Sequence, residues 1–337
     1  MVQRLKKIKE WNNVDKKKFH NEILPTNQPA ILKSLVSDWP SVSRAKESNQ
    51  SIVEYMINFE QGLQTTALIS PPEVKGRFDY QPDMKRFNFE RSNQPLRKML
   101  EDLINLAKIA NPPAFSIQGI DVEQHFIGFS AENKQSLLEQ TENARAWIGN
   151  RTTTRTHYDH VDNLACVVAG HRKFTLFPPE QVSNLYVGPL LSTPAGPSVS
   201  LVDLAEPDLV KYPKFENALS NALEAELEPG DAIYIPYFWW HNVESLDEFN
   251  ILVNYWWNQG NTSSDIPYQC LLQSMLSIPQ LPAYKRKIWR KFFDHYVFQL
   301  DGSPGEHLPD DLQDIVTSLS PEHKEKMKKM ISASLLQ

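Results

Sequence analysis

The chain contains four triplets in which a histidine precedes an acidic residue by two positions: His20/Glu22, His157/Asp159, His160/Asp162 and His323/Glu325. On a β-strand, side chains at i and i+2 point to the same face, so such a triplet can supply two ligands to one metal ion. Two histidines and one carboxylate leave open positions on the metal for a chelating co-substrate and dioxygen, which is the arrangement of non-haem iron(II) oxygenases. The triplets are therefore the first candidates for chemistry.

The surroundings of the four triplets single out His157 and Asp159. His20 and His323 lie in helical patterns, where side chains at i and i+2 diverge by about 200° and cannot easily chelate one ion. His157 and Asp159 instead follow an extended, Thr-rich stretch and precede the apolar run at residues 164–169. We therefore predict that these two side chains lie at the mouth of a buried sheet and bind a metal ion.

Strand alternation argues against the His160/Asp162 triplet as a source of ligands, and a second motif indicates the third ligand. His160 and Asp162 have the opposite alternation, and we expect them in the loop between two strands. The third ligand must come from a distant strand, for which His241 is the best candidate. It closes residues 229–241, where a Pro-Gly-Asp turn leads to a short apolar strand and an aromatic stretch that would exclude water. A buried structural histidine is the alternative for this position.

The segments that must position these ligands have the sequence pattern of short β-strands separated by turns. Between residues 113 and 260, short runs rich in Val, Ile, Phe, Tyr and Trp alternate with Gly, Pro and Asn, which predicts a mostly antiparallel barrel or sandwich. The predicted strands cover residues 115–118, 146–149, 156–158, 164–169, 174–177, 232–235, 241–245 and 250–256. We therefore expect a mainly β core.

Helical patterns flank this core on both sides. Residues 1–112 are expected to add surface helices within residues 1–22, a strand and turn at 27–40, and helices at 51–59 and 96–110. Residues 261–337 are expected to be helical, with helices at 268–275, 284–296, 309–318 and 323–336. The chain is thus divided into residues 1–112, 113–260 and 261–337.

Six motifs follow one another in the predicted core: HYD at residues 157–159, GHRKFTLFPP at 170–179, PGD at 229–231, YIP at 234–236, WWH at 239–241 and NYW at 254–256. In this order they resemble the Jumonji C, or cupin-like, family of iron(II) and 2-oxoglutarate dependent oxygenases. Within the family, they are most similar to the asparaginyl hydroxylase that inhibits hypoxia-inducible factor. The resemblance implies a double-stranded β-helix, a flattened jelly-roll barrel with the metal at its open end.

The resemblance also implies a role for particular residues. Those implied as iron ligands are His157, Asp159 and His241, and those implied around 2-oxoglutarate are Thr154, Asn163, Arg172, Asn254 and Trp256. In the family, a lysine usually anchors the distal carboxylate of 2-oxoglutarate, whereas this chain has Arg172 at that place and Lys173 beside it. Because neighbouring strand residues face opposite sides, only one can point inward, and we predict that it is Arg172. Ser116 replaces a tyrosine that the family places near the same carboxylate, which implies a wider pocket.

Composition narrows the possible classes of protein. With 337 residues, 41% of them hydrophobic and 23% charged, the chain is long enough for a large core and is not mainly disordered. A net charge of −6 disfavours nucleic acid as a partner, except through a local basic patch. The chain has two cysteines, and it shows neither a secretory nor a membrane-spanning pattern. These features predict a cytoplasmic protein without a membrane partner.

The function predicted from these features is a dioxygenase that uses Fe(II), dioxygen and 2-oxoglutarate to hydroxylate a side chain of a protein or peptide. Succinate and carbon dioxide would be the co-products. The alternative substrate for the same chemistry is a transfer RNA base or a small molecule. The alternatives are a metal-binding sensor or scaffold without turnover, and a cupin isomerase or zinc hydrolase with the same ligands.

The C-terminal helical patterns have apolar faces, which include Leu271, Met275 and Ile278 in one segment and Ile288, Phe292 and Tyr296 in the next. An uncovered apolar face on a helical hairpin favours self-association. The resemblance implies the same, because relatives form a two-fold dimer through helices in this region. We therefore expect a homodimer that is formed through residues 261–337.

Overall fold

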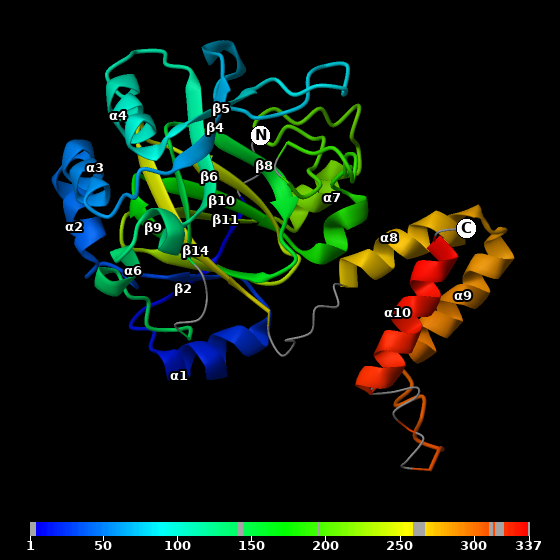
Figure 1. Cartoon of the computed structure of the whole chain (residues 1–337). Helices are drawn as coiled ribbons and strands as arrows, with labels where there is room; N and C mark the ends of the chain where they lie inside the picture. The colour runs from blue at the N-terminus through cyan, green and yellow to red at the C-terminus, as the bar shows by residue number, and fades with distance from the viewer. Residues whose placement is uncertain are drawn as a thin grey trace. The chain divides into compact units, whose positions relative to one another are not determined.

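The computed structural model describes residues 5–139, 144–194, 196–258, 267–309, 313 and 320–335. The chain separates into two compact units, Met1–Asn261 and Thr262–Gln337, and each is described by itself (Figure 1). The helix predicted at residues 309–318 lies almost entirely outside the described residues.

Two β-sheets form the first unit. In the described residues, the smaller sheet has the strand order β1 (Lys6–Lys7), β11 (Leu223–Leu227), β10 (Arg172–Phe177), β13 (Trp240–Ser245) and β8 (Thr153–Tyr158). The larger sheet has the order β2 (Lys9–Trp11), β3 (Ala30–Leu32), β12 (Ala232–Ile235), β9 (Asp162–Ala169), β14 (Asn250–Trp257), β7 (Ala144–Gly149), β6 (Ala114–Asp121), β4 (Gln64–Ser70) and β5 (Glu90–Pro95). Except for β1–β11 and β2–β3, the paired strands are antiparallel.

An apolar core lies between the two sheets. Phe174 and Leu176 of β10 pack there with Val167 of β9, Ile233 of β12 and Leu252 of β14, all of them buried. Along each strand, alternate side chains enter this core and the others face outward. The prediction of a mainly β, jelly-roll core with flanking helices is confirmed.

Helices cover the outward faces of both sheets. Those of the first unit are α1 (Lys16–Lys18), α2 (Pro40–Glu47), α3 (Asn49–Ile57), α4 (Leu96–Leu106), α5 (Val122–His125), α6 (Phe129–Glu132) and α7 (Phe215–Ser220). In Figure 1, α2, α3 and α4 lie on one side of this unit, where their apolar faces share a core with the larger sheet. Phe215 of α7 packs with Tyr158, Phe177 and Trp240 on the outward side of the smaller sheet.

The strands predicted in the core are present, and most are longer than predicted. The expectation of surface helices within residues 1–22 was right only for α1 and a π-helical turn, Phe19–Ile23, because the strands β1 and β2 precede them. Ile8, between the two strands, is 3% exposed, and its burial accounts for the extended conformation. Strand β11 was not predicted, and residues 60–92, which contain β4 and the start of β5, were expected to hold strands and loops without defined bounds. Their polar residues hide the apolar alternation, as in β11, where Ala225 and Leu227 are buried between exposed or half-buried glutamates.

The turn before β12 attaches the N-terminal segment to the core. Gly230 has φ +108, and a Cβ there would lie 3.1 Å from the Cα of Ser37, so the close approach favours glycine. The buried carboxylate of Asp231 accepts a hydrogen bond from the backbone N–H of Ser34 at 2.9 Å and forms an ion pair with Lys33. The predicted Glu228–Asp231 turn is confirmed by the bond from the N–H of Asp231 to the carbonyl of Glu228 at 3.0 Å.

The second unit consists of helices in the residues that the structure describes. They are α8 (Pro267–Ser277), a 3₁₀ turn (Ile278–Gln280), α9 (Ala283–Tyr296) and α10 (Pro321–Leu335). Large apolar side chains of α9 are about half exposed, among them Ile288 (54%), Phe292 (53%) and Tyr296 (50%). Among the described helices of the whole chain, none combines the length and hydropathy that a bilayer crossing needs.

Candidate metal centre

The pairing of β8 with β13 brings the two predicted histidine ligands together. His157 and His241 are direct cross-strand partners in this antiparallel pair, and the register shifts between His241 and Val243. Asp159 follows one residue after the end of β8, so its side chain shares the inward alternation of His157. Residues that are 84 positions apart in the sequence therefore meet at one end of the smaller sheet.

The three side chains form a compact cluster. The ligand atoms of His157, Asp159 and His241 all lie within 4.8 Å of one another, and this is the one candidate metal cluster among the described residues. Nε2 of His241 is 3.6 Å from Oδ2 of Asp159, and the two imidazole centroids are 4.1 Å apart. Two imidazole nitrogens and one carboxylate at this spacing fit a divalent transition metal such as iron(II), cobalt(II) or zinc(II).

Backbone carbonyls set the tautomer of both histidines. Nδ1 of His157 lies 2.8 Å from the carbonyl oxygen of Arg155, and Nδ1 of His241 lies 3.0 Å from that of Trp239. A carbonyl oxygen only accepts, so each Nδ1 carries the proton and each Nε2 lone pair is available to a metal. Burial, reinforced by the neighbouring His241, lowers the pKa of His157 to about 4, which keeps its ring neutral near pH 7.

A chain of hydrogen bonds orients the carboxylate of Asp159. The indole N–H of Trp147 donates to Oδ1 of Asn254 at 2.9 Å, Nδ2 of Asn254 donates to Oδ1 of Asn163 at 3.3 Å, and Nδ2 of Asn163 donates to Oδ2 of Asp159 at 3.4 Å. Groups that hold a metal ligand in this way fix its direction and raise its affinity for the metal. Asn163 and Asn254, which the resemblance implied as 2-oxoglutarate contacts, support the metal ligand in this structure.

A cavity of about 440 Å³ opens over the cluster. All eight predicted site residues line it: Thr154, His157, Asp159, Asn163, Arg172, His241, Asn254 and Trp256. Apolar side chains complete the wall, including Phe174, Ile235 and Leu252 from both sheets. A cavity of this size, mainly apolar with a few convergent polar groups, is suited to a small ligand.

Arg172 is a buried cation in this cavity. Its side chain is 6% exposed, and its recorded hydrogen bond is a long one, 3.4 Å from a terminal guanidinium nitrogen to the carbonyl oxygen of Trp147. Its Nε has no acceptor, and no carboxylate within the described ranges forms an ion pair with it. Burial lowers the pKa of Arg172 to about 10, which still leaves it charged at pH 7. A buried charge without a counter-charge is costly, so the site is prepared for an anionic ligand.

Lys173 and Ser116 lie elsewhere. The side chain of Lys173 is 38% exposed and pairs with Glu244 at 3.4 Å on the outward side of the sheet. Ser116, which the resemblance placed near the distal carboxylate, is buried in β6 but is not part of the cavity wall. The predicted opposite orientation of Arg172 and Lys173 is therefore observed, whereas the position of Ser116 gives no direct widening of the cavity.

The remaining histidines of the triplets have other partners. Nε2 of His20 lies 3.1 Å from the carbonyl oxygen of Leu137, and the ring of His323 contacts Ser320. His160 lines the cavity, and its ring packs 5.2 Å from that of Phe238. None of these three belongs to the metal cluster found in the described residues.

Two residues with a place around the site were not predicted. Trp147 lines the cavity, and its indole N–H donates to Asn254. Asp162, expected in a loop, is 6% exposed at the start of β9, where its Oδ1 accepts hydrogen bonds from the hydroxyl of Tyr234 and the N–H of Tyr237. Every residue of β9 is buried, whichever face it points to, so alternation gave no signal for the burial of Asp162.

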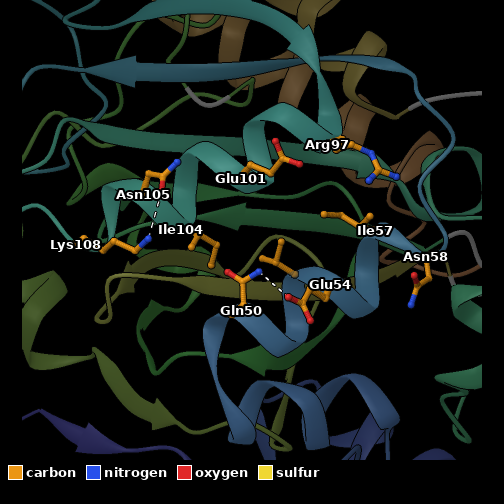
Figure 2. Close-up of a pocket in the computed structure, with 10 residues that line it drawn as sticks. Gln50, Glu54, Ile57, Asn58, Arg97, Glu101, Ile104, Asn105 and Lys108 are labelled. Carbon is orange, nitrogen blue, oxygen red and sulfur yellow. Dashed lines mark hydrogen bonds between the residues drawn. The ribbon is translucent and has the colours of Figure 1, made fainter.

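Another hollow of about 450 Å³ lies between α3 and α4 (Figure 2). Two pairs of its polar side chains are hydrogen-bonded: Gln50 donates to Glu54 at 2.8 Å, and Lys108 donates to Asn105 at 3.5 Å. Its wall contains neither histidine nor cysteine. It is a groove between two surface helices and not a second candidate for catalysis.

The two-sheet core and its His-Asp-His cluster define a class of protein, and the comparison with known families agrees. The cupin-like domain family matches residues 16–263, and the chain belongs to that family. The resemblance to the Jumonji C, or cupin-like, family is confirmed at this level.

Relatives with different names are similar to this chain. It is 42% identical over 112 residues to "Lysine-specific demethylase JMJ31" of Arabidopsis thaliana, covering 33% of this chain and 20% of the relative. It is 30% identical over 251 residues to "HSPB1-associated protein 1" of Rattus norvegicus, covering 69% and 49%. It is 26% identical over 272 residues to "tRNA wybutosine-synthesizing protein 5" of Danio rerio, covering 73% and 74%. The chain thus spans about half or less of the length of the first two.

Proposed function

We propose that this protein is an Fe(II) and 2-oxoglutarate dependent dioxygenase that hydroxylates a side chain of a protein or peptide. The observation that carries the proposal is the presence of Arg172, a buried cation without a carboxylate partner in the described residues, in the same cavity as the His-Asp-His cluster. The cavity therefore suits a ligand that chelates a metal at one end and carries an anionic group at the other. The 2-oxo acid and the distal carboxylate of 2-oxoglutarate meet both requirements.

The strand register sets the spacing between the metal cluster and Arg172, which the ligand must span. Along β10 and β13, His241 pairs with Leu176, and Ser245 pairs with Arg172 four residues away. That separation is about 13 Å between backbone levels, which the long arginine side chain can shorten. Thr154, which pairs with Val243, lies between the two levels.

Iron with 2-oxoglutarate and dioxygen supplies the oxidation of a C–H bond, with succinate and carbon dioxide as co-products. The chain's own residues bind, orient and exclude water. His157, Asp159 and His241 would hold the metal through two Nε2 atoms and a carboxylate oxygen. The guanidinium of Arg172 can donate two parallel hydrogen bonds to a carboxylate, and the aromatic rings of Trp147 and Trp256 restrict the access of water.

A protein or peptide substrate is supported by two of the relatives, whose names refer to lysine demethylation and to association with HSPB1. The likeness to the asparaginyl hydroxylase makes asparagine in an extended peptide the first side chain to test. Such a peptide could approach the cavity at its rim, where His160, Val161 and Pro197 are half-buried.

The test is turnover with peptides. The protein with Fe(II), 2-oxoglutarate and dioxygen is expected to form succinate in the presence of an accepted peptide, whose mass then rises by one oxygen atom. Formaldehyde in place of a stable oxidised product would indicate demethylation. Succinate release that no peptide stimulates would contradict the proposed substrate class, and unchanged activity without oxygen would favour an isomerase or zinc hydrolase.

A transfer RNA base is the second candidate substrate. It is favoured by the relative named for wybutosine synthesis, of which the chain covers 74%. The net charge of −6 disfavours it, because binding to a phosphate backbone relies on positive charge. The same assay with transfer RNA separates the two substrates. If the Fe(II)–2-oxoglutarate complex forms but neither substrate stimulates turnover, a sensor or scaffold is favoured.

We also propose that two copies of the protein associate through their C-terminal units. Tyr284, Ile288, Phe292 and Tyr296 recur every four residues on one face of α9, and each is at least 50% exposed. A continuous apolar stripe of this kind is covered in a two-fold dimer of helical hairpins.

Phe292→Glu is expected to convert a dimer into a monomer, because it places a charge in the centre of this stripe. Light scattering at micromolar concentration measures the mass. Arg290→Glu, about 200° around the same helix from Ile288, is the control and should leave the dimer intact. A wild-type protein with monomeric mass would contradict the proposal.

We propose a cytoplasmic location as well, since Cys166 and Cys270 are both free. Cell fractionation tests this location.

A further inference from the structure

The turn between β12 and β13 has an unusual backbone conformation. The N–H of Trp239 donates to the carbonyl of Pro236 at 3.1 Å, and Phe238 has φ +62. This is the pattern of a type II turn with Phe238 at the third position, where glycine or asparagine is usual. A bulky residue rarely adopts this conformation, which persists only when surrounding contacts hold it in place.

The same turn contacts two of the three candidate metal ligands. The backbone N–H of Phe238 donates to the carbonyl oxygen of Asp159 at 3.2 Å. The carbonyl oxygen of Trp239 accepts the Nδ1–H of His241 at 3.0 Å. A displacement of this turn would therefore move the backbone of one ligand and rotate the ring of another.

Asp162 holds the turn from the larger sheet. Its Oδ1 accepts a hydrogen bond from the backbone N–H of Tyr237 at 3.3 Å, and another from the hydroxyl of Tyr234 at 2.7 Å. Tyr234 is 1% exposed, and its ring stacks on that of Trp257 at 6.0 Å. No lysine, arginine or histidine forms an ion pair with Asp162 in the part of the chain that the structure describes. Only hydrogen bonds thus offset the cost of burying this carboxylate, and they determine its position.

We propose that Asp162 is a positioning residue of the metal centre: through the N–H of Tyr237 it fixes the turn that orients Asp159 and His241. It makes no contact with either ligand side chain that the structure records, so it acts through the backbone. The inference deepens the proposed function, because it concerns the same metal cluster. Its test uses metal affinity and does not require oxygenase turnover.

The test is titration of the metal-free protein with Co(II), followed by the visible absorption bands of the bound ion. Asp162→Ala is expected to weaken Co(II) binding by about 10- to 100-fold and to alter the bands, since groups that orient metal ligands have effects of this size. Asp162→Asn keeps an oxygen acceptor at the same place and is expected to retain most of the affinity.

Asp231→Ala is the matched control for a purely structural effect. Asp231 is also a buried carboxylate, 1% exposed. It directly precedes β12, whereas the 236–239 turn follows the opposite end of that strand. Its loss is expected to lower the free energy of unfolding, measured with urea, and to leave Co(II) affinity unchanged. If Asp231→Ala weakened Co(II) binding as much as Asp162→Ala, the positioning role would be wrong.

A second pair of variants tests the same hydrogen bond without changing Asp162. Proline is favoured at the second position of a type II turn, so Tyr237→Pro should preserve the turn while removing the N–H that donates to Asp162. Tyr237→Ala removes the same ring but keeps the N–H. Weaker Co(II) binding by Tyr237→Pro than by Tyr237→Ala is expected, and equal binding would overturn the inference.

The outcomes for the wild-type protein separate this inference from the proposed function. Wild-type protein that does not bind Co(II) would contradict the metal centre itself. Wild-type protein that binds Co(II), together with a folded Asp162→Ala variant of equal affinity and identical bands, would overturn only the role of Asp162.

Discussion

The His157→Ala variant is expected to lose the weak visible charge-transfer band that Fe(II) and 2-oxoglutarate form with the wild-type protein under anaerobic conditions. The imidazole supplies one of three donor groups that lie within 4.8 Å of one another. We expect the affinity for Fe(II) to fall by more than about 100-fold, because even the loss of a group that merely orients a ligand costs 10- to 100-fold. Titration of the band measures both Fe(II) and 2-oxoglutarate binding.

The metal-free variant should remain folded. His157 is held neutral by burial and donates one hydrogen bond, so its removal is expected to cost about 1–3 kcal/mol of unfolding free energy. His171→Ala is the matched control, because His171 is exposed on a turn and pairs with Asp247 at 2.8 Å, away from the cluster. A normal band in a folded His157→Ala variant would rule out the assigned metal centre.

Arg172→Met should have two effects of opposite sign. Removing a buried cation that has no ion-pair partner among the described residues is expected to stabilise the ligand-free protein by about 1–4 kcal/mol. The loss of charge-assisted hydrogen bonds to a carboxylate is expected to cost about 3 kcal/mol of 2-oxoglutarate binding, or roughly 100-fold in affinity. Urea unfolding measures the first effect, and anaerobic titration measures the second.

Lys173→Met provides the comparison within the same strand. Lys173 is adjacent in sequence but pairs with Glu244 outside the cavity, so this change should leave 2-oxoglutarate affinity within about two-fold. Arg172→Lys keeps the charge and loses the planar fork, and it should fall between wild type and Arg172→Met. If Lys173→Met alone weakened binding of 2-oxoglutarate, the assignment of the anchor would be reversed.

Local sequence patterns predicted the core strands well where apolar residues dominate. Residues 232–235 were predicted as a strand and form β12 with the same bounds, because all four side chains are buried. Residues 64–70, which form β4, have a mixed burial pattern and lack this signal. The lysine-rich start of the chain resembled a solvated helix face, and its pairing with β11 and β3, together with the burial of Ile8, makes it extended.

The residues of the candidate site also fall into two groups, those that local patterns predicted and those whose role depends on distant partners. The spacing of His157 and Asp159, the motif that ends in His241, and the alternation of Arg172 and Lys173 are local properties, and the cavity contains the residues that they indicated. The roles of Trp147 and Asp162 depend on partners that are 107 and 72 positions away. No local pattern contains those partners.

The sequence by itself determined which side chains could chelate a metal, which strand face they share and which family the motifs resemble, because strand alternation and motif order are short-range properties. Only the tertiary structure decided that the carboxylate of Asp159 is held by Asn163, that Arg172 is buried without an anionic partner in the described residues, and that the 236–239 turn contacts two ligands. The physical reason is that burial and hydrogen-bond partnership depend on which strands pair, and strand pairing joins residues that are distant in the chain.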